Sequence, residues 1–374
     1  MTYQGDSYPA ELKFQTDPLP AVSFLALLKY FDMVLRLNQM NARWWNERLL
    51  ACRGQEQAAL HEKAGTVRNK MFGKKVFVRA VLEISNYCRQ NCRYCAMRRD
   101  NRSLERLRLP LDLLRRIVLE SLPSSVTDIN IQAGEDPVAV REIVLPLIQE
   151  IKRETNLGIG VCLGTLDYEL YDELLEAGAN YYIIKIETGS AEHYQKMRAP
   201  GSLEKRLAAI QHLTQTGWHV SSGIIAGLPL QTPAMLTESL KLLSSLPLAG
   251  ASISPFIPGS DTPYAHAEAG NIETTLNCVA LLRLANPRYI IPAVSAMNLL
   301  GSDGYVRALR AGANLATINL TPREWREHYP IYKKDRWIMH EERVMRAIED
   351  ADCAVSETSL TRSLQERLLA PLRK

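Results

Sequence analysis

The sequence predicts an α/β protein whose main part is a closed (β/α)8 barrel of the TIM type, preceded by an N-terminal helical extension. From residue 75 onward, short apolar segments alternate with longer amphipathic segments, as is typical of parallel strands joined by helical crossovers. Eight strand-like segments can be counted, and eight such units close naturally into a barrel. Each candidate motif follows directly after a strand, where barrels assemble their active sites. An open, doubly wound sheet is the alternative.

The chain divides into three predicted parts. Residues 1–74 form an arm and helices that cap the barrel, because apolar residues in 20–64 follow helical spacing. Residues 75–335 form the barrel, and residues 336–374 form a C-terminal helical tail. The sequence leaves the role of the N-terminal helices and the oligomeric state open.

The predicted strands share short apolar runs rich in β-branched residues, and they are 76–85, 128–132, 158–163, 181–187, 219–226, 251–254, 289–294 and 313–319. The predicted helices between them share amphipathic spacing, and they are 110–120, 139–155, 167–177, 191–198, 203–216, 233–245 and 273–286. Gly178 and Gly312 each follow a predicted helix, at the left-handed position that commonly ends a helix.

Composition limits the kind of protein. The formal net charge is +4, from 45 basic and 41 acidic residues, which argues against nucleic-acid and membrane partners. No signal peptide is recognisable, and no apolar run approaches the roughly 20 residues that a membrane span needs. Seven cysteines in 374 residues are too few for a disulfide framework. A cytoplasmic protein is therefore expected.

Three clustered cysteines carry the strongest functional signal. Cys88, Cys92 and Cys95 follow the first predicted strand with the spacing C-x3-C-x2-C. Three thiolates can hold three irons of a 4Fe–4S cubane and leave the remaining iron open for chemistry. A structural zinc site usually has four protein ligands, and a redox pair needs only two cysteines. Three unrelated buried cysteines are the remaining alternative. The spacing favours a 4Fe–4S cluster.

This motif, with Tyr94 before its last cysteine, resembles the signature of the radical S-adenosylmethionine (SAM) superfamily. The resemblance implies that SAM chelates the open iron and that Tyr94 belongs to the cofactor site. It also implies that one electron cleaves SAM to methionine and a 5′-deoxyadenosyl radical, so that the cofactor carries the demanding chemistry. Reduction of the cluster implies an electron donor such as ferredoxin or flavodoxin.

Further motifs resemble the SAM-binding positions of this superfamily. Gly134 and Glu135 follow the second strand and resemble the glycine–glutamate motif that receives the methionyl ammonium. Glu187 ends the fourth strand and corresponds to the residue that binds the ribose hydroxyls. Arg198 resembles the arginine that pairs with the SAM carboxylate, for which a guanidinium is well suited. Read singly, these residues are an ordinary strand-to-helix turn and a surface arginine.

An apolar, glycine-containing segment follows the fifth strand. Its residues Ile225, Gly227 and Leu228 resemble the segment that lies against the adenine ring of SAM. A plain buried strand is the alternative for this segment alone. All these motifs follow successive strands in order, which favours interpreting them together as one SAM-binding site.

Between about residues 81 and 332 the chain resembles the biotin-synthase-like branch of the superfamily, and within it the HydE family of FeFe-hydrogenase maturases. The resemblance is carried by residues 95–101, 132–137, 227–229 with 231–232, 255–258 with 261–263, 292–297, 312–314 and 319–322. It implies a complete barrel with an internal cavity for a small molecule or a metal complex. The cavity residues would be Ser295, Met297, Asn319, Tyr329 and Tyr332. The alternative is that Met297 and both tyrosines are core residues, and for Met297 alone the core role is favoured.

Two departures distinguish this chain from HydE proteins. Where these commonly read Arg-His-Glu-Thr, this chain has Lys185 and Ile186 before Glu187. Lysine keeps the charge but loses the planar fork of arginine. Many HydE proteins carry extra cysteines near the C-terminus for a second cluster, whereas here no cysteine follows Cys278 until Cys353, so a single cluster is expected.

Other functions stay open at this point. A methylornithine-synthase-like mutase and another HydE-like methylase or maturase share the branch. Sulfur insertion of the biotin-synthase type uses a second iron–sulfur cluster as the sulfur source. It is disfavoured, because the remaining cysteines that could bind such a cluster, Cys162, Cys278 and Cys353, lie on different predicted elements. Free cysteines are usually buried small hydrophobes. A non-catalytic iron–sulfur carrier has no need for the SAM-binding residues.

Overall fold

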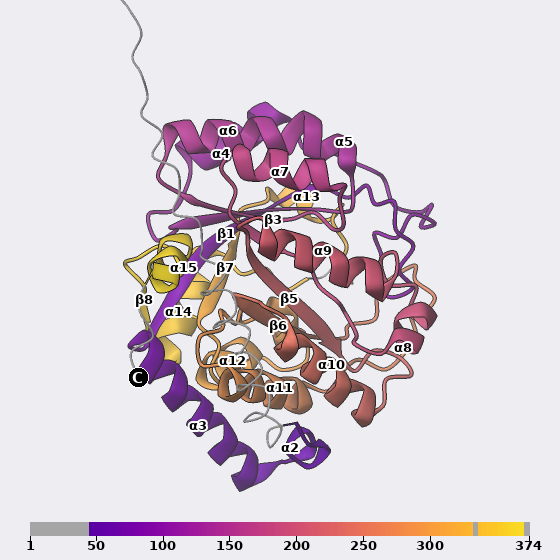
Figure 1. Cartoon of the computed structure of the whole chain (residues 1–374), viewed down its shortest axis with the longest axis vertical. Helices are drawn as coiled ribbons and strands as arrows, with labels where there is room; N and C mark the ends of the chain where they lie inside the picture. Colours follow the sequence, from indigo (N-terminus) through magenta and orange to yellow (C-terminus); the bar gives the residue numbers. More distant parts are fainter. Residues whose placement is uncertain (1–44, 332–335, 370–374) are drawn as a thin grey trace, which may run out of the picture.

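The computed structural model of the chain describes residues 45–331 and 336–369, and its strands run parallel around a common axis (Figure 1). The sheet order is β6-β5-β4-β3-β2-β1-β7, and β8 pairs with the start of β1. The strands are β1 (Lys75–Ser85), β2 (Asp128–Ala133), β3 (Gly158–Cys162), β4 (Tyr181–Ile183), β5 (His219–Ala226), β6 (Gly250–Pro255), β7 (Leu315–Asn319) and β8 (Ala354–Val355).

The segment between β6 and β7 closes the ring. Ile290 forms a parallel bridge with Gly250 of β6, and Pro292 forms one with Leu315 of β7. The predicted strand 289–294 is therefore present as two isolated bridges rather than as a continuous strand. Pro292 explains part of this difference, because proline has no N–H group to donate to a ladder. The predicted barrel fold is confirmed, and we refer to this segment, residues 289–293, as the seam.

Helices surround the ring of strands (Figure 1). The outer helices of the barrel are α4 (Leu111–Glu120), α5 (Pro137–Ala139), α6 (Leu145–Glu154), α7 (Tyr168–Glu176), α8 (Ala191–Lys196), α9 (Leu203–Gln215), α10 (Pro233–Ser245), α11 (Ile272–Ala285), α12 (Gly304–Arg310), α13 (Arg323–Arg326) and α14 (Glu341–Asp350). A π-helical turn, Val140–Val144, joins α5 to α6, and a 3-10 turn, Ser295–Leu299, follows the seam. None of the described helices has the length and hydropathy needed to cross a bilayer.

Two helices precede the barrel, α2 (Glu47–Ala51) and α3 (Gly54–Phe72). They pack against α11 on the outside of the ring, where Gln57 donates to Asn277 at 2.9 Å. The amide of Asn277 in turn donates to the carbonyls of Leu50 and Cys52. A buried asparagine thus joins the helical extension to the barrel wall. The N-terminal part of the predicted extension lies outside the described residues.

Alternation along the strands separates a packed wall from a chamber. On β1, Val78, Ala80 and Leu82 point toward the helices and are at most 1% exposed. Arg79, between them, points into the ring and keeps accessible surface. The same partial exposure marks inward-facing residues on other strands or just after them, which are Gln132, Cys162, Lys185, Ser254, Thr317 and Asn319. Because their neighbours in sequence are buried against helices, this surface belongs to a space inside the barrel.

The N-terminal ends of the strands form a closed floor. An apolar cluster fills it, made of Phe72, Phe77, Tyr181, Ile290, Leu315, Leu360 and Leu364. The last two belong to α15 (Leu360–Leu369), which lies across the strand ends. The buried carboxylate of Asp128 accepts hydrogen bonds from the backbone N–H groups of Leu360 (2.7 Å) and Thr361 (3.1 Å). It thereby satisfies donors that the start of a helix leaves unpaired.

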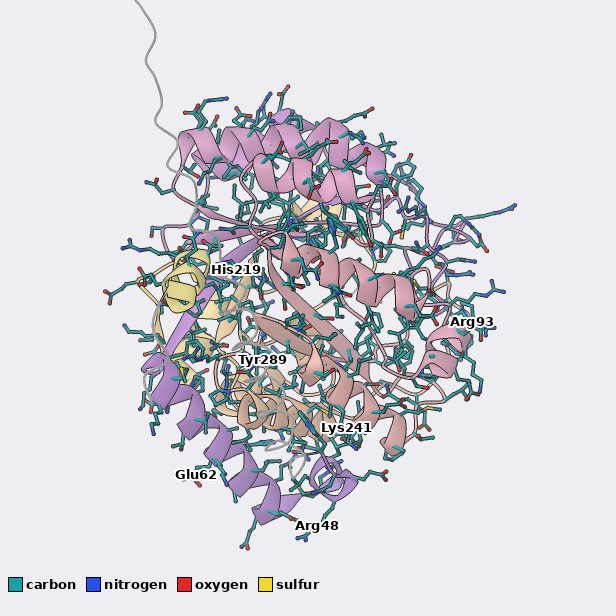
Figure 2. The ribbon with its side chains drawn as sticks, in the orientation of Figure 1. Arg48, Glu62, Arg93, His219, Lys241 and Tyr289 are labelled. Atoms are coloured by element: carbon teal, nitrogen blue, oxygen red, sulfur yellow. The ribbon has the colours of Figure 1, made fainter. Side chains whose placement is uncertain are left out.

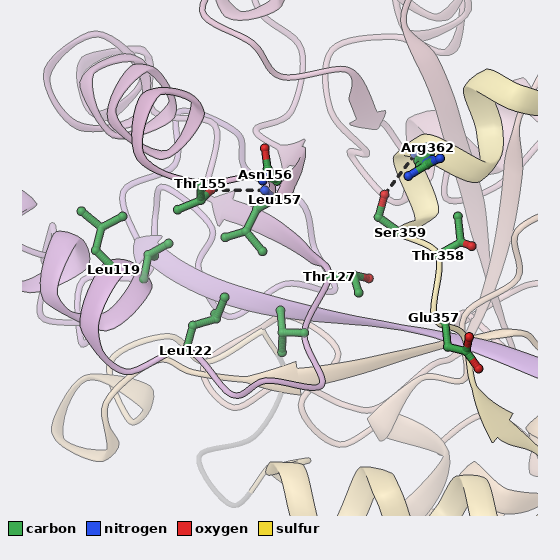
Figure 3. A pocket seen from close by; sticks show the side chains of 12 residues that line it. Leu119, Leu122, Thr127, Thr155, Asn156, Leu157, Glu357, Thr358, Ser359 and Arg362 are labelled. Carbon is green, nitrogen blue, oxygen red and sulfur yellow. Dashed lines mark hydrogen bonds between the residues drawn. The ribbon is translucent and has the colours of Figure 1, made fainter.

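A surface hollow of about 550 Å³ also lies at the floor end, between α4, the loop before β3 and the start of α15 (Figure 3). Leu119, Leu122, Asn156, Glu357 and Arg362 are among the residues that line it. None of the residues predicted for the functional site lies in this hollow, and it is at the opposite end of the strands from the cysteines.

Candidate active site

The cysteine loop begins where β1 ends, so it lies at the C-terminal mouth of the barrel. Asn86 closes the loop, because its amide donates to the carbonyl of Glu105 (2.7 Å) and its side-chain oxygen accepts from Leu107 N–H (2.7 Å). The guanidinium of Arg106 donates to the carbonyls of Asn86 (2.6 Å) and Met97 (2.9 Å). These side chains supply partners for a loop backbone that has few regular hydrogen bonds.

The three thiols lie close enough to influence one another. Burial raises the pKa of Cys92 well above its ordinary value, and repulsion from Cys95 and Cys88 adds to this effect. Burial likewise raises the pKa of Cys95 to about 12 and raises that of Cys88. Such thiols keep their protons in the metal-free protein, so binding of iron must displace those protons.

An apolar cluster connects the predicted motifs at the mouth. It contains Cys92 and Tyr94 from the cysteine loop, Tyr194 and Met197 from the end of α8, and Leu228 from the loop after β5, together with Ala199 and Phe256. Cys95 and Ile225 pack against it. The structure therefore brings the cysteines, the predicted tyrosine and the predicted adenine segment together, although they are far apart in the sequence.

Gly134 allows the end of β2 to lie directly on the cysteine loop. A Cβ atom at this position would lie 2.1 Å from the carbonyl oxygen of Tyr87 and 2.9 Å from Cβ of Cys88. Its N–H donates to the carbonyl of Ser85 at 2.9 Å. The close backbone approach predicted for Gly134 is present, and it fixes the β2 loop against the first cysteine.

Glu135 is buried, and its carboxylate joins three segments of the mouth. One oxygen accepts from Arg89 (2.7 Å) and Gln90 (2.5 Å) of the cysteine loop, and the other accepts from Thr165 N–H (3.0 Å) after β3. Its own N–H donates to the sulfur of Cys88 at 3.4 Å. The residue predicted to bind the ammonium of SAM thus also holds the cysteine loop in place.

The neighbouring Asp136 makes a second tie of this kind. Its carboxylate accepts from Arg108 at 2.7 and 3.0 Å and from the hydroxyl of Ser85 at 2.6 Å. Burial would raise the pKa of Asp136, but the hydrogen bonds from Arg108 and Ser85 outweigh it, so the pKa is lowered.

Glu187 combines a strained backbone with an incompletely hydrogen-bonded carboxylate. Its backbone φ is +61°, which is uncommon for a residue with a Cβ and costs conformational energy. Lys185 Nζ lies 3.4 Å from Oε2, an ion-pair distance. That oxygen is nevertheless buried without a hydrogen bond. The charge of Glu187 acts on Cys92 and Cys95, so this carboxylate faces the cysteine loop.

Arg206, in α9, is a residue that sequence reasoning missed. It is 3% exposed, and its Nε has no hydrogen-bond partner. Burial alone would lower the pKa of Arg206, but Tyr194 and the carboxylates of Glu135 and Glu187 outweigh it and raise the pKa. In sequence the residue is one of several cations on an amphipathic helix, so only the fold reveals that it points at the two carboxylates.

Arg198 follows the end of α8 with a φ of +46°. The adjacent residue, Met197, accepts a backbone hydrogen bond from Arg93 at 2.9 Å, so this turn lies on the cysteine loop. The side chain of Arg198 is exposed, and no ion pair is formed by it within the described residues. Like Glu187, Arg198 is at the mouth in a strained conformation, which is a common feature of functional sites.

The predicted adenine segment has its backbone fixed by one side chain. Gln231 accepts from Gly227 N–H at 2.7 Å and donates to the carbonyl of Ile225 at 3.0 Å. Gly227 has a φ of +82°, and a Cβ there would lie 2.5 Å from Cα of Gly270. Leu228 is buried in the apolar cluster of the mouth. The turn is therefore rigid and presents apolar side chains beside the cysteines.

Polar and charged groups line the chamber below the mouth. Arg79 donates from Nε to the hydroxyl of Thr317 at 3.2 Å, and it forms no ion pair within residues 45–331 and 336–369. Burial lowers its pKa, against the opposing influence of Tyr181 and Cys162. The side-chain oxygen of Asn130, an inward-facing residue of β2, is buried without a partner. The chamber is thus suited to a polar ligand.

The predicted chamber residues have different surroundings. Ser295 and Asn319 are half-buried at the mouth ends of the seam and of β7. Tyr329 is 3% exposed, and its pKa is raised well above the ordinary value by burial and by Glu83, although Gln132 hydrogen-bonds its hydroxyl. Met297 is fully buried in the main hydrophobic core, so it takes the core role. Tyr332 lies outside the described residues.

Sequence reasoning also missed a pair of residues that closes the mouth near Tyr329. Glu83 accepts from Arg336 through two hydrogen bonds of 2.5 and 2.6 Å, and both side chains are buried. This bidentate pair connects β1 to the segment before α14. The partners are far apart in the sequence, so no local pattern could have indicated their pairing.

The donors at the mouth fit a 4Fe–4S cluster with bound SAM. Within the described part of the chain, no three His, Cys, Asp or Glu side chains surround a single metal ion. Zinc gathers its thiolates at one point, whereas a cubane takes one thiolate at each of several irons. Buried atoms without partners on Glu187 and Arg206 offer one negative and one positive group to a zwitterionic ligand.

Comparisons with known proteins agree with this geometry. Residues 82–243 match the family model of the radical SAM superfamily. The [FeFe] hydrogenase maturase subunit HydE of Thermotoga maritima is 36% identical over 275 residues, which are 73% of this chain and 78% of HydE. The 3-methylornithine synthase of Methanosarcina acetivorans is 29% identical over 265 residues, 70% of this chain and 75% of that enzyme. The crystal structure of methylornithine synthase (PylB) superposes with a TM-score of 0.77 at 25% identity, covering 89% of this chain and 99% of that chain.

The chain belongs to the radical SAM superfamily. Within it, the chain is similar to HydE and methylornithine synthase and also to biotin synthases, such as that of Clostridium tetani at 26% identity. The predicted family, the enzymatic character and the cofactors, a 4Fe–4S cluster and SAM, are thereby confirmed.

Proposed function

We propose that this radical SAM enzyme performs a HydE-like step in the maturation of a metallocofactor, acting on a small molecule or metal complex enclosed in the barrel. The observation that carries the proposal is the identity of 36% with HydE over 275 residues. The chamber supports it, because its inward-facing polar groups lie directly below the cysteine loop. An enclosed site of this kind keeps water away from a reactive intermediate.

Each cofactor would be held by residues already described. Cys88, Cys92 and Cys95 would bind the cluster, which supplies the electron that cleaves SAM when it is bound. Glu187 would accept from the ribose hydroxyls, and Arg198 would pair with the carboxylate of SAM. The remaining contacts would come from Tyr94, Gly134, Glu135, Ile225, Gly227 and Leu228.

The chamber residues would position the substrate. Arg79 has no carboxylate partner within the described residues, so an anionic group of the substrate would be favoured there. Lys185 would add a second positive charge at the level of Glu187. Ser295, Asn319 and Tyr329 would supply hydrogen bonds nearer the mouth. A cytoplasmic enzyme and an electron donor such as ferredoxin or flavodoxin complete this proposal.

Formation of 5′-deoxyadenosine tests the radical SAM part. Anaerobically reconstituted protein should convert SAM to 5′-deoxyadenosine when a chemical reductant is present, and the Cys92→Ala variant should not. Equal product from both proteins would exclude the cysteine loop as the source of the electron.

Complementation tests the HydE-like part. The protein should replace HydE in a maturation system that contains an FeFe hydrogenase and its other maturases, so that hydrogen evolution appears. Hydrogenase that stays inactive, while SAM is still cleaved, would reject the HydE-like step and leave the radical SAM activity intact.

A methylornithine-synthase-like mutase is the second candidate. It is favoured by the superposition on methylornithine synthase, which covers 99% of that chain. Incubation with the amino acid that methylornithine synthase rearranges, SAM and a reductant separates the two candidates. Formation of 3-methylornithine would support the mutase, and an unchanged amino acid together with active hydrogenase would support the HydE-like step.

A further inference from the structure

The positive charge of the chain is concentrated next to the cysteines. Residues 89–108 contain seven arginines, one aspartate and one glutamate, a net charge of +5. The whole chain carries +4, so all remaining residues together carry −1. A charge distribution of this kind creates a local field that a near-neutral protein otherwise lacks.

Some of these arginines are used inside the molecule. Arg89 and Arg108 pair with the buried carboxylates of Glu135 and Asp136. Arg106 donates only to backbone carbonyls of the loop itself. These cations build the site, and the charges of Arg89 and Arg108 are balanced by their carboxylate partners.

Three other arginines, Arg93, Arg99 and Arg102, remain at the surface, and we refer to them as the arginine rim. Arg99 is 63% exposed in its side chain and pairs only with Asp100 of its own loop. Arg102 is exposed, and no partner is found for it in the described part of the chain. Arg93 is half-buried, 5.5 Å from the ring of Tyr264, and lies at the edge of the molecule near α8 (Figures 1 and 2).

The arginine rim also lies close to the cysteines, both in sequence and through a backbone hydrogen bond. Arg93 lies between Cys92 and Cys95 in sequence, and Arg99 N–H donates to the carbonyl of Gln90 at 2.7 Å. Cys88 and Cys95 are only half-buried. The rim therefore lies on the cysteine loop itself, beside thiols that keep some accessible surface.

We propose that the arginine rim is the docking site of a small acidic electron-transfer protein. The carrier would lose one electron and a cluster on Cys88, Cys92 and Cys95 would gain it, with no bond formed or broken. Because docking here is useful only if the cluster is reduced, the docking site rests on the function proposed above. Complementary charge would steer the carrier to this face and fix its orientation.

Other roles of these arginines give different results in the same experiment. A nucleic-acid partner needs an extended basic surface, and the residues outside 89–108 are net negative. Arginines near a cluster could instead raise its reduction potential. That role predicts a change with every reductant, whereas docking predicts a change with the protein carrier alone.

The test uses the cluster-containing enzyme and an acidic flavodoxin as the probe. In the Arg99→Glu/Arg102→Glu variant, the Kd for oxidised flavodoxin at low ionic strength should rise tenfold or more, and its dependence on salt should flatten. Reduction of the cluster by flavodoxin should slow accordingly, as followed by the loss of visible absorbance. Reduction by the small cation methyl viologen radical and the affinity for SAM should stay within twofold of the wild-type values.

Arg48→Glu is the matched control, because Arg48 is 81% exposed and lies far from the cysteine loop (Figure 2). It should leave the Kd for flavodoxin unchanged. An unchanged Kd in the rim variant, or an equal weakening in the control, would overturn the docking site. Equal slowing with flavodoxin and viologen would also overturn it in favour of potential tuning. Each of these outcomes is independent of whether chemically reduced enzyme cleaves SAM, which tests the function itself.

Discussion

Two buried carboxylates at opposite ends of the barrel differ in how they are satisfied. At the floor, Asp128 accepts from Leu360 N–H, Thr361 N–H and the hydroxyl of Thr127. At the mouth, Glu187 keeps an oxygen without a hydrogen bond and has a left-handed backbone. An unsatisfied buried group and a strained conformation both cost stability. The difference shows that the floor is built for stability, whereas the mouth gives up stability to keep groups ready for a ligand.

The largest expected effect is loss of the cluster from the mouth. Cys92→Ala should reduce the iron content and the visible absorbance of reconstituted protein to background, because the cubane would lose one of the three thiolates proposed to hold it. Cys278→Ala is the control, since this cysteine is buried in α11 and should leave the iron content unchanged. Normal iron content in Cys92→Ala would count against the site.

A variant at the floor should be less stable but should bind SAM as tightly as the wild type. Asp128→Ala removes the acceptor for two backbone N–H groups of α15, so the free energy of unfolding should fall by about 2–4 kcal/mol. Urea unfolding measures this loss, and the Kd for SAM should not change. Asp128→Asn, which keeps one carbonyl acceptor, should lose less. If the floor variant instead weakened SAM binding, the division between floor and mouth would fail.

A mouth variant should show the reverse behaviour. Arg198→Ala should weaken SAM binding by about 1.5–3 kcal/mol through loss of a charged hydrogen-bonded pair, which is about 10- to 150-fold in Kd. The free energy of unfolding should hardly change, because the side chain is exposed. Arg102→Ala is the matched control, and equal SAM affinity in both variants would remove Arg198 from the site.

The smallest effect is a pH dependence of the tie between Asp136 and Arg108. Because the pKa of Asp136 in the folded protein lies below its ordinary value of 3.8, its stabilising contribution is present above pH 3.8 and is lost as the pH falls below it. Asp136→Asn should lower the free energy of unfolding by about 1–2 kcal/mol at pH 7. This difference between variant and wild type should shrink below pH 3.8. A difference that stays constant across that range would mean that the tie does not depend on the charge.

Much of the fold could be predicted because it follows from local patterns. Alternation and segment counting gave the order of the strands, and the glycine at 178 has the positive φ expected after a helix. The predicted strand 181–187 is continuous only to Ile183, and its last residue, Glu187, pairs with β5 as an isolated bridge to Ile224. The short β8 was missed, because two residues carry no detectable period.

The candidate site was predictable only where residues act through a motif. The cysteines, Gly134 and the turn at Gly227 lie together at the mouth, as their order after successive strands suggested. Arg206 and Arg106 were not predictable, because their roles depend on carboxylates and carbonyls brought near by folding. Met297 shows the opposite case, in which a residue inside a matching motif packs in the core.

The seam affects where the wall of the chamber can open locally. One parallel bridge and two or three backbone hydrogen bonds join it to the wall on each side, whereas β1 is paired with β2 along most of its length. Thermal fluctuation should therefore part the wall there first, and amide hydrogens at Ile290 should exchange with deuterium sooner than those at Leu82. Local opening at the seam would let the enclosed volume adapt to the bound substrate, while β1, which leads into the cysteine loop, stays fixed.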